Sequence, residues 1–460
     1  MRAEDKERLA RRQRMLARER GEPLPQPPAQ AADKPPAAPP PAAPQAGAAQ
    51  KKPPARPAAT AAAQPPQAAE PAPAAARLRP LSPILRRRKR RRRLAAAALA
   101  LAALLVLAGL SGALGALGAL AGDAVDSAYL YLHRGSGWPA ETGIESPSRV
   151  EPLAGGFVVL DAEDTAVYSA YGSCIRTIQP GYARPALAAG NTRFVLYDRT
   201  GTSVRVESRT RTLKTLTMPQ AVMLCAISSN GTLGVVTQAE RYVAQLQLLD
   251  AATYEPLFTW KMTRDDGTPV ALAFAPDNRR FAVGTVAARD GRLVSKVSLS
   301  RIAGKDAPLT YTADAGSMIL QLQWLPGGRL LAVLDTCAVL IDPDTGTELA
   351  RYDFAGRELL GVSVSGRTAA LLLGSHSGSS LVLLDAALTL LAEADAAQAT
   401  AVTCTDTAAY LIENNTVACY TLDGSLRWVH AYESRPQLVL DAAQTLLFTA
   451  GRAEVLSAPE

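Results

Sequence analysis

Two hydrophobic patterns divide the chain into parts of different character. Residues 94–122 form an unbroken stretch of apolar and small residues without a charge, whereas from about residue 149 to residue 457 apolar and polar positions alternate in short runs. At a rise of 1.5 Å per residue, the uncharged stretch is long enough to cross a hydrocarbon core of roughly 30 Å as a helix. Alternation with a period of two is typical of β-strands. The pattern therefore predicts one transmembrane helix over 94–122, followed by an all-β domain over 149–457.

The β-rich part repeats one unit: an apolar strand, a turn, a second strand ending in small residues, and then a strand that closes on Asp with a following Gly. Four segments show the first half most clearly, beginning at Cys225, Leu272, Leu322 and Gly361: CAISSNGTLGVVT, LAFAPDNRRFAVGT, LQWLPGGRLLAVLD and GVSVSGRTAALLLG. Three segments show the second half: FVLYDRTGTSVRV, AVLIDPDTGTELARYDF and CYTLDGSLRWVHAY. Such strands are joined by dipeptides typical of tight hairpin turns, namely Asn230-Gly231, Gly327-Gly328 and Asp423-Gly424.

The spacing of these units predicts a radial arrangement. They recur roughly every 35 to 50 residues, which is the spacing of four-stranded blades in a β-propeller. Blade starts fall near residues 149, 185, 221, 268, 317, 359, 399 and 436. These starts give eight blades, with seven as the alternative. Because the last blade is short, we expect its missing strand to come from the stretch before Phe157, so that the two ends of the domain close the ring.

A run of eight basic residues directly precedes the predicted helix: Arg86, Arg87, Arg88, Lys89, Arg90, Arg91, Arg92 and Arg93. Cytoplasmic flanks of membrane helices hold the excess of Lys and Arg, and the other flank here begins with Asp123 and Asp126. The run is therefore expected to determine the topology of a single-pass protein of the cytoplasmic membrane, with a cytoplasmic N-terminus and an extracytoplasmic propeller. A cleaved signal peptide is the alternative, but its apolar region spans only about 7 to 15 residues near the N-terminus.

Charge is distributed unevenly along the chain. The net charge is +7 at pH 7, but residues 1–93 hold 22 Lys or Arg against 7 Asp or Glu, which leaves 27 against 35 for the remainder. The β-rich domain is thus mildly acidic, and a nucleic-acid partner is not expected. A basic run beside a bilayer predicts contact with anionic lipids, worth on the order of 1 kcal/mol per residue near the surface.

The segments that flank the predicted helix have biased compositions. Residues 1–20 form a charged tail of good helix formers. Residues 21–85 are mostly Pro, Ala and Gln, and this linker is predicted to be disordered because it cannot bury enough apolar surface. Residues 123–148 are assigned to a juxtamembrane stalk.

Small residues recur four positions apart inside the predicted helix. Ser111 with Gly115 is one such pair, and Gly118 with Gly122 is another. This spacing lets two helix backbones approach closely, so it permits a weak homodimer through the membrane helix.

Cysteines and histidines are few and dispersed. They are Cys174, Cys225, Cys337, Cys404, Cys419, His133, His376 and His430. The cysteines lie in apolar runs and are expected to be small buried residues, without the spacing of a disulfide framework or a zinc site. If Cys404 and Cys419 occupy alternate strands of one sheet, two strand spacings of about 4.8 Å keep them too far apart to bridge.

Two short motifs suggest chemistry only in part. The segment from Gly374 to Gly378, GSHSG, has His where a serine hydrolase carries its nucleophile. The segment from Asp342 to Glu348, DPDTGTE, matches half of a calcium loop but also ordinary turn chemistry. Both are predicted to be turns, and no catalytic residue, cofactor or metal site is expected.

The blade motifs resemble known propellers. FAPDNRRFAVG looks like the inner hairpin of WD-repeat proteins, and IDPDTGTELARYD with LDGSLRW looks like the turn of quinoprotein-like blades. The whole layout over residues 85–457, including GGFVVLDAEDTAVYSAYGS and GYARPALAAGNTRFVLYDRTG, is similar to an uncharacterised bacterial family, best known from clostridia-like organisms, of single-span membrane-anchored propellers. That family has no known function, so the resemblance implies architecture and location and transfers no catalytic residue.

These features together predict a binding or scaffold protein without catalytic activity, because a propeller offers broad loop surfaces and a central channel. The expected partner is an unknown protein of the cell envelope. A quinoprotein-like oxidoreductase is one alternative, and a transmembrane sensor that signals through dimerisation is the other.

Overall fold

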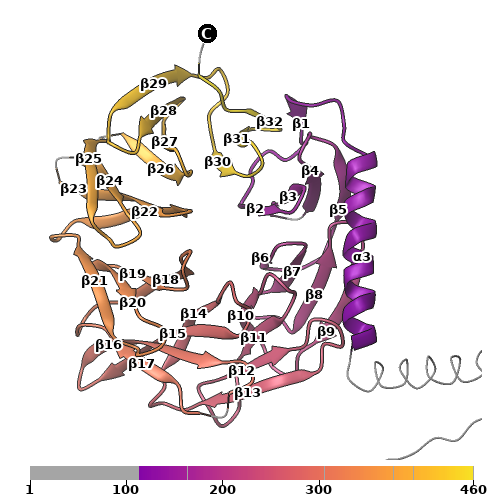
Figure 1. Cartoon of the computed structure of the whole chain (residues 1–460), viewed down its shortest axis with the longest axis vertical. Helices are drawn as coiled ribbons and strands as arrows, with labels where there is room; N and C mark the ends of the chain where they lie inside the picture. The colour runs from indigo at the N-terminus through magenta and orange to yellow at the C-terminus, as the bar shows by residue number, and fades with distance from the viewer. Residues whose placement is uncertain (1–112, 163, 305, 377, 397, 459–460) are drawn as a thin grey trace, which may run out of the picture. The chain divides into compact units, whose positions relative to one another are not determined.

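A computed structural model describes residues 113–458, except residues 163, 305, 377 and 397. Its strands form eight four-stranded antiparallel sheets arranged around a central axis, so the domain is an eight-bladed β-propeller (Figure 1). The predicted all-β class and the predicted eight blades are confirmed, and the seven-blade alternative is wrong. Each blade begins within two residues of its predicted start.

The blades are numbered in chain order, and the strands of each blade run from the innermost, first, to the outermost, fourth. Blade 1 contains β2 (Arg149–Leu153), β3 (Gly156–Leu160), β4 (Thr165–Ser169) and β5 (Cys174–Ile178). Blade 2 contains β6 (Pro185–Ala189), β7 (Arg193–Asp198), β8 (Ser203–Ser208) and β9 (Thr212–Thr217), and blade 3 contains β10 (Val222–Ile227), β11 (Leu233–Thr237), β12 (Ala244–Leu249) and β13 (Pro256–Met262). Blade 4 contains β14 (Thr268–Phe274), β15 (Arg280–Arg289), β16 (Arg292–Arg301) and β17 (Leu309–Thr312).

Blade 5 contains β18 (Ile319–Trp324), β19 (Leu330–Leu334), β20 (Cys337–Ile341) and β21 (Glu348–Asp353). Blade 6 contains β22 (Glu358–Ser365), β23 (Thr368–Ser375), β24 (Gly378–Leu384) and β25 (Leu390–Asp395), and blade 7 contains β26 (Ala399–Cys404), β27 (Ala408–Glu413), β28 (Thr416–Thr421) and β29 (Leu426–Ala431). Blade 8 contains β30 (Leu438–Asp441), β31 (Thr445–Thr449), β32 (Arg452–Val455) and β1 (Ala140–Glu141).

The core lies between neighbouring blades. The second strands carry nearly continuous apolar runs because both of their faces pack against other blades, and β3, β11 and β19 are buried at every position. Outermost strands such as β25 and β29 are largely exposed and alternate in burial. One apolar cluster, for example, joins Val297 and Leu299 of blade 4 to Leu330 and Val339 of blade 5.

The ring closes with a strand from the N-terminal side of the domain. Strand β1 pairs antiparallel with β32, with Ala140 opposite Ala453. The backbone N–H of Gly451 also donates to the Ile144 carbonyl at 3.0 Å. This confirms that a segment before Phe157 completes the eighth blade.

The segment predicted to be a stalk, residues 123–148, is folded against the propeller. Helix α3 (Ala113–Leu132) continues through Asp123 without a break and lies beside the outer strands of blades 1 and 2 (Figure 1), while β1 belongs to blade 8. The hydrophobic pattern could not show this, because the helix is held in part through Asp126, a carboxylate that is only 2% exposed.

A buried polar network fixes α3 to the propeller. Arg209, in the loop between β8 and β9, is also 2% exposed. Its Nη1 donates to a backbone carbonyl of blade 1 at 2.6 Å, and its Nη2 donates to the Asp123 carbonyl and to Ser127 Oγ at 2.9 Å. Thr210 Oγ1 donates to Asp126 Oδ1 at 2.5 Å. Burial lowers the pKa of Arg209, and the carboxylates of Asp126 and Asp123 oppose this shift.

Among the residues that the structure describes, no helix is both long and apolar enough to cross a membrane. Helix α3 includes residues 113–122 of the predicted span. The remainder of that span, residues 94–112, lies outside the described residues, as do the basic run Arg86–Arg93, the tail and the linker.

Connections between strands alternate between two faces of the ring because successive strands are antiparallel. We call the face with the first-to-second and third-to-fourth loops face 1. Face 2 carries the second-to-third loops and the connections between blades. The polar contacts described for α3 go to a face 1 loop of blade 2, and Arg209 in this loop also bonds to a face 1 loop of blade 1.

Candidate functional site

The innermost strands of blades 3 to 7 share a local irregularity. Near the start of each strand, one residue is inserted between two residues that pair normally with the second strand, which is a β-bulge. The inserted residues are Met223, Val270, Leu320, Leu360 and Thr400. By contrast, the innermost strands of blades 1, 2 and 8 pair regularly with their neighbours.

The bulges expose apolar side chains. Val270, Leu320 and Leu360 are 41%, 43% and 46% exposed. Pro269 and Ile319, which directly precede two of these residues, are buried. The inserted residue thus leaves the regular alternation of the strand, while its predecessor keeps its place in the core.

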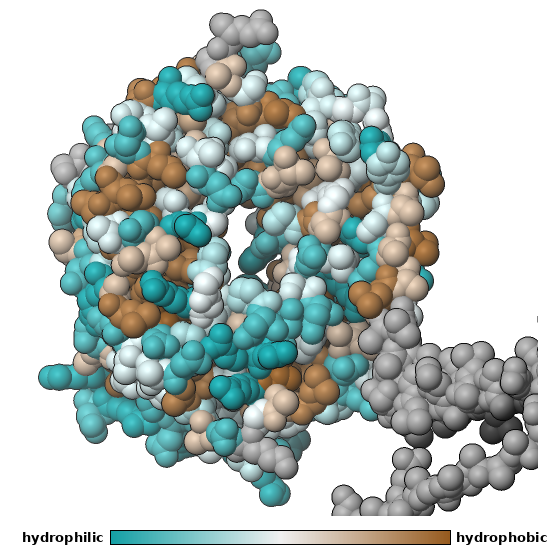
Figure 2. Space-filling view, viewed as in Figure 1, coloured by the Kyte–Doolittle hydropathy of each residue, from teal (hydrophilic) through white to brown (hydrophobic). Residues whose placement is uncertain are grey.

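All five bulges lie at the same end of the central channel. Innermost strands of adjacent blades contact one another around the axis, and between blades 5 and 6 Gln323 Nε2 donates to the Val364 carbonyl. Figure 2 shows the molecule hollowed at the centre of the ring. Because the bulges occur where these strands begin, they lie on the face 2 side. The inserted residues therefore lie at the face 2 ends of the innermost strands, where Val270, Leu320 and Leu360 are exposed and Met223 is partly buried.

Polar contacts join innermost strands within the channel. Thr403 Oγ1 donates to the Val439 carbonyl at 3.0 Å. At the face 1 end, Ser365 Oγ donates to Asp441 Oδ2 at 2.8 Å and lies 3.4 Å from Asp406 Oδ1. Burial raises the pKa of Asp441, the Ser365 hydrogen bond lowers it, and the Asp406 charge raises it again. The innermost strands thus carry acidic groups at their face 1 ends, whereas exposed apolar residues lie at their face 2 ends.

One bulge residue lines a pocket on face 2 between blades 6 and 7. The pocket has a volume of about 640 Å³ and includes Leu360. This side chain lies over Gly374, where an added Cβ would be 3.0 Å from Leu360 Cδ1, so the missing side chain makes room for the leucine. Arg357 also lines the pocket and pairs with Glu393 at 2.5 Å. Burial lowers the pKa of Arg357, but its contacts with the Tyr352 hydroxyl and Glu393 raise this pKa above the ordinary value.

The motifs considered for chemistry are turns, as predicted. Strand β23 ends at Ser375 and β24 begins at Gly378, so this segment joins a hairpin. In the other motif, Asp342 Oδ1 accepts the backbone N–H of Asp344 at 2.9 Å, and Glu348 pairs with Arg351. Within the described ranges, no three His, Cys, Asp or Glu side chains are grouped as ligands for a metal ion.

All five cysteines are free, and four of them are buried. Cys404 and Cys419 lie on β26 and β28, which are alternate strands of blade 7, as the argument against a disulfide requires. The expectation of burial is wrong for Cys174, because it is the first residue of the outermost strand β5 and is exposed.

The sequence contained a signal for the bulges that period-two alternation alone does not reveal. Each bulge in blades 3 to 6 is the second member of an apolar doublet that breaks the alternation: Val222-Met223, Pro269-Val270, Ile319-Leu320 and Leu359-Leu360. Two adjacent apolar residues point to opposite sides of a regular strand, so a doublet beside an otherwise alternating strand indicates an inserted residue.

The fold defines a class, the eight-bladed β-propellers, and the family follows from the sequence of the domain. Residues 138–454 match the model of a family of unknown function, DUF5711, and the chain belongs to this family. The predicted similarity to a family of unknown function is thereby confirmed. No curated protein matches the chain.

Solved propeller structures share the fold at low sequence identity. The C-terminal WD40 domain of Sif2 is 11% identical, with a TM-score of 0.50 over 70% of this chain and 99% of that one. BamB from Moraxella catarrhalis is 13% identical, with a TM-score of 0.47 over 67% and 95%. Apo AztD from Citrobacter koseri is 8% identical, with a TM-score of 0.48 over 63% and 87%. At sequence identities this low, the similarity shows a shared fold and nothing about function.

Proposed function

We propose that this protein is a membrane-anchored binding protein whose propeller holds a protein partner on face 2, at the channel mouth of blades 3 to 7. The observation that carries the proposal is the repeated bulge. The same strand position is irregular in five consecutive blades, and in four of them the inserted residue is apolar. Bulges commonly redirect a side chain next to a functional site.

Protection of a sheet edge is the simpler explanation for these bulges. The innermost strand is an edge strand, and bulges, charges and prolines all discourage unwanted pairing at an edge. Edge protection does not require an exposed leucine, however, and a charged residue would serve better. The exposed apolar side chains of Val270, Leu320 and Leu360 therefore favour a contact surface.

The expected binding energy indicates what else the partner must contact. Full burial of a Leu or Val side chain contributes about 1.5 to 3 kcal/mol, so burial of the exposed part of each bulge residue contributes on the order of 1 kcal/mol. Three such contributions, from Val270, Leu320 and Leu360, do not by themselves exceed the cost of association. The partner should therefore also use polar groups beside the mouth, such as the wall of the Leu360 pocket that contains Arg357.

Membrane presentation is the second part of the proposal. Its support is the basic run Arg86–Arg93 before an uncharged stretch at residues 94–122. With this topology, protease added to intact cells stripped of their wall should digest the propeller and spare the first 85 residues. Replacement of the eight basic residues by Gln should scramble the orientation. A protected propeller, or a mature N-terminus near Gly122, would contradict the anchored topology.

The binding part is tested by chemical crosslinking of the full chain in intact cells. A face 2 variant carries Val270→Asp, Leu320→Asp and Leu360→Asp. The matched control on face 1 carries Leu257→Asp, Leu349→Asp and Leu426→Asp, which change equally exposed leucines at the starts of outermost strands. We expect the face 2 variant to lose the captured protein and the control to retain it, and the purified partner to bind the wild-type chain directly. The same captured protein at the same yield from both variants would refute the proposed surface.

A further inference from the structure

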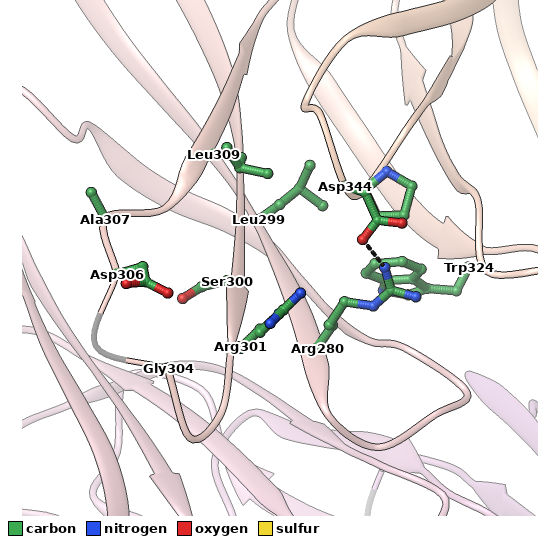
Figure 3. A pocket seen from close by; sticks show the side chains of 11 residues that line it. Arg280, Leu299, Ser300, Arg301, Gly304, Asp306, Ala307, Leu309, Trp324 and Asp344 are labelled. Atoms are coloured by element: carbon green, nitrogen blue, oxygen red, sulfur yellow. Dashed lines mark hydrogen bonds and ion pairs between the residues drawn. The ribbon is translucent and has the colours of Figure 1, made fainter.

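A second site lies on face 1, between blades 4 and 5, and it does not depend on the proposal for face 2. A pocket of about 240 Å³ is lined there by the paired strands β15 and β16, the loop before β17, the end of β18 and the loop between β20 and β21 (Figure 3). Pockets for drug-sized ligands have volumes of roughly 300 to 1,000 Å³. This smaller pocket suits one or two amino-acid side chains.

Two arginines lie opposite each other in this pocket. Arg280 and Arg301 are direct partners in the antiparallel pairing of β15 with β16. Directly opposite residues project from the same side of a sheet, and like charges in that position destabilise the pairing. Asp277 and Asp344 offset the charge of Arg280, and an anion beside Arg301 would do the same for the second guanidinium group.

Arg280 is already held in place by its neighbours. Its Nε and Nη1 lie 3.0 Å from Asp277 Oδ2 and Asp344 Oδ1, and its guanidinium carbon lies 5.6 Å from the ring centroid of Trp324. The Trp324 indole N–H donates to a carbonyl of β14 at 3.2 Å. Burial raises the pKa of Asp277, but backbone and side-chain hydrogen bonds lower it further. This carboxylate therefore stays charged beside Arg280.

Arg301 has no such partners. Its side chain is exposed, and among the described residues it forms no ion pair or hydrogen bond. Asp306 lines the pocket too, and in the view of Figure 3 Arg301 lies between Asp306 and Arg280. Leu309, which is exposed, and Leu299, which is buried, also line the pocket.

We infer that this pocket binds an acidic side chain of a partner polypeptide. The carboxylate lies between the guanidinium groups of Arg280 and Arg301, and a neighbouring apolar side chain packs against Leu299 and Leu309. Guanidinium groups match the geometry of a carboxylate and form strong charge-assisted hydrogen bonds with it. Asp277 and Trp324 hold Arg280 in place, whereas Arg301 supplies a positive charge that no described residue pairs with.

Binding can be followed through the indole of Trp324. The full 460-residue chain, ¹⁵N-labelled in detergent micelles, contains four tryptophans, so its indole N–H resonances are few, and Trp324→Phe assigns the one required. The probe is the peptide acetyl-Leu-Glu-Leu-Glu-amide, and its counterpart with Gln in place of Glu is the neutral control. We expect the Glu peptide, and not the Gln peptide, to shift the Trp324 resonance to saturation.

Three variants make the assignment specific. Arg301→Gln should weaken the Glu peptide at least about tenfold, because it removes a charge-assisted contact. Asp306→Asn should strengthen it roughly two- to fivefold, because it removes an exposed like charge. Arg289→Gln, which changes an exposed arginine of the same blade paired with Asp265, should leave the affinity unchanged.

Several outcomes would overturn the inference. These are equal shifts from the two peptides, unchanged affinity of Arg301→Gln, and a full shift with inorganic phosphate alone, which would indicate a general anion site. The face 2 variant with Asp at positions 270, 320 and 360 is expected to bind the Glu peptide normally. The experiments can therefore distinguish failure of the face 1 pocket from failure of the proposed face 2 surface.

Discussion

Blades 3 to 7 and blades 8, 1 and 2 have the same four-stranded topology but differ in the innermost strand. Five consecutive blades carry a bulge at its start, whereas the other three pair without interruption. The three regular blades are also those that receive the N-terminal segment. Strand β1 completes blade 8, and α3 is docked on blades 1 and 2.

The difference separates two tasks within one fold. Regular blades bind another part of the same chain through a paired strand and through buried groups such as Arg209 and Asp126. Irregular blades keep exposed apolar side chains at the channel mouth. Stability is therefore expected to depend most on the regular blades, and partner binding on the bulged ones.

Removal of the closing strands should have the largest effect. Deletion of residues 435–460 removes three strands of blade 8 and leaves β1 without its partner β32. Because two sheet edges become exposed, we expect the whole domain to lose its cooperative unfolding transition, as measured by circular dichroism in urea. A truncated chain with an unchanged transition would instead indicate an open array of independent blades.

Deletion of single residues compares the two kinds of innermost strand directly. Without Leu320, Ile319 and Gln321 become neighbours that already pair with Leu334 and Val333, so the ladder becomes regular, and the loss in unfolding free energy should stay below about 1 kcal/mol.

The matched deletion is that of Glu151 in the regular strand β2, where it lies opposite Val158. Loss of this residue forces a slip of one position, which turns the preceding side chains to the opposite faces, and it should cost about 4 kcal/mol. Chemical denaturation of the two deletions measures the contrast. Similar costs would mean that the bulge is a structural requirement.

Substitution of a single arginine, Arg209 on a regular blade or Arg301 on a bulged blade, compares how much each kind of blade contributes to stability. Arg209→Ala leaves the Asp126 carboxylate buried without a nearby cation, and Asp126 Oδ2 already has no hydrogen-bond partner among the described residues. The substitution should lower the unfolding free energy by about 3 kcal/mol. Arg301→Ala is the control, because exposed Arg301 should change stability by less than about 0.5 kcal/mol. Equal effects in urea titrations would argue against the docked helix.

Substitution of Asp441 tests whether its charge at the face 1 end of the channel destabilises the folded domain. Its pKa is raised in the folded protein, so its ionisation opposes folding at neutral pH. Asp441→Asn should therefore stabilise the domain at pH 7, by less than about 1 kcal/mol. The gain should vanish as the pH falls below the unfolded-state pKa of about 4, where Asp441 is protonated in both states. A gain that is independent of pH would exclude this explanation.

Much of the architecture could be predicted from periodicity. Turn dipeptides and apolar runs placed all eight blades, because strands buried on both faces leave a strong local signal. The docking of α3 could not be predicted, since the buried Asp126 bonds to Thr210 and the buried Arg209 bonds to Ser127, in each case across more than 80 positions of sequence. Local hydrophobicity contains no information about such contacts.

The candidate surfaces were harder to predict for a different reason. The doublets at Ile319-Leu320 and Leu359-Leu360 are visible in the sequence, but their meaning depends on the exposure of the second residue. The pairing of Arg280 with Arg301 requires the register of β15 and β16, which is set by a loop of only two residues, Asp290 and Gly291. Register and exposure arise from the assembled sheet.

The most direct test of the face 2 surface is site-specific photocrosslinking in intact cells. The photoreactive amino acid p-benzoylphenylalanine is placed, one position at a time, at Val270, Leu320 and Leu360, and at Leu349 on face 1 as the control of similar exposure. If face 2 of the bulged blades holds the partner, the three bulge positions will give the same protein adduct and Leu349 will give none. An adduct at Leu349 without adducts at the bulge positions would contradict the account.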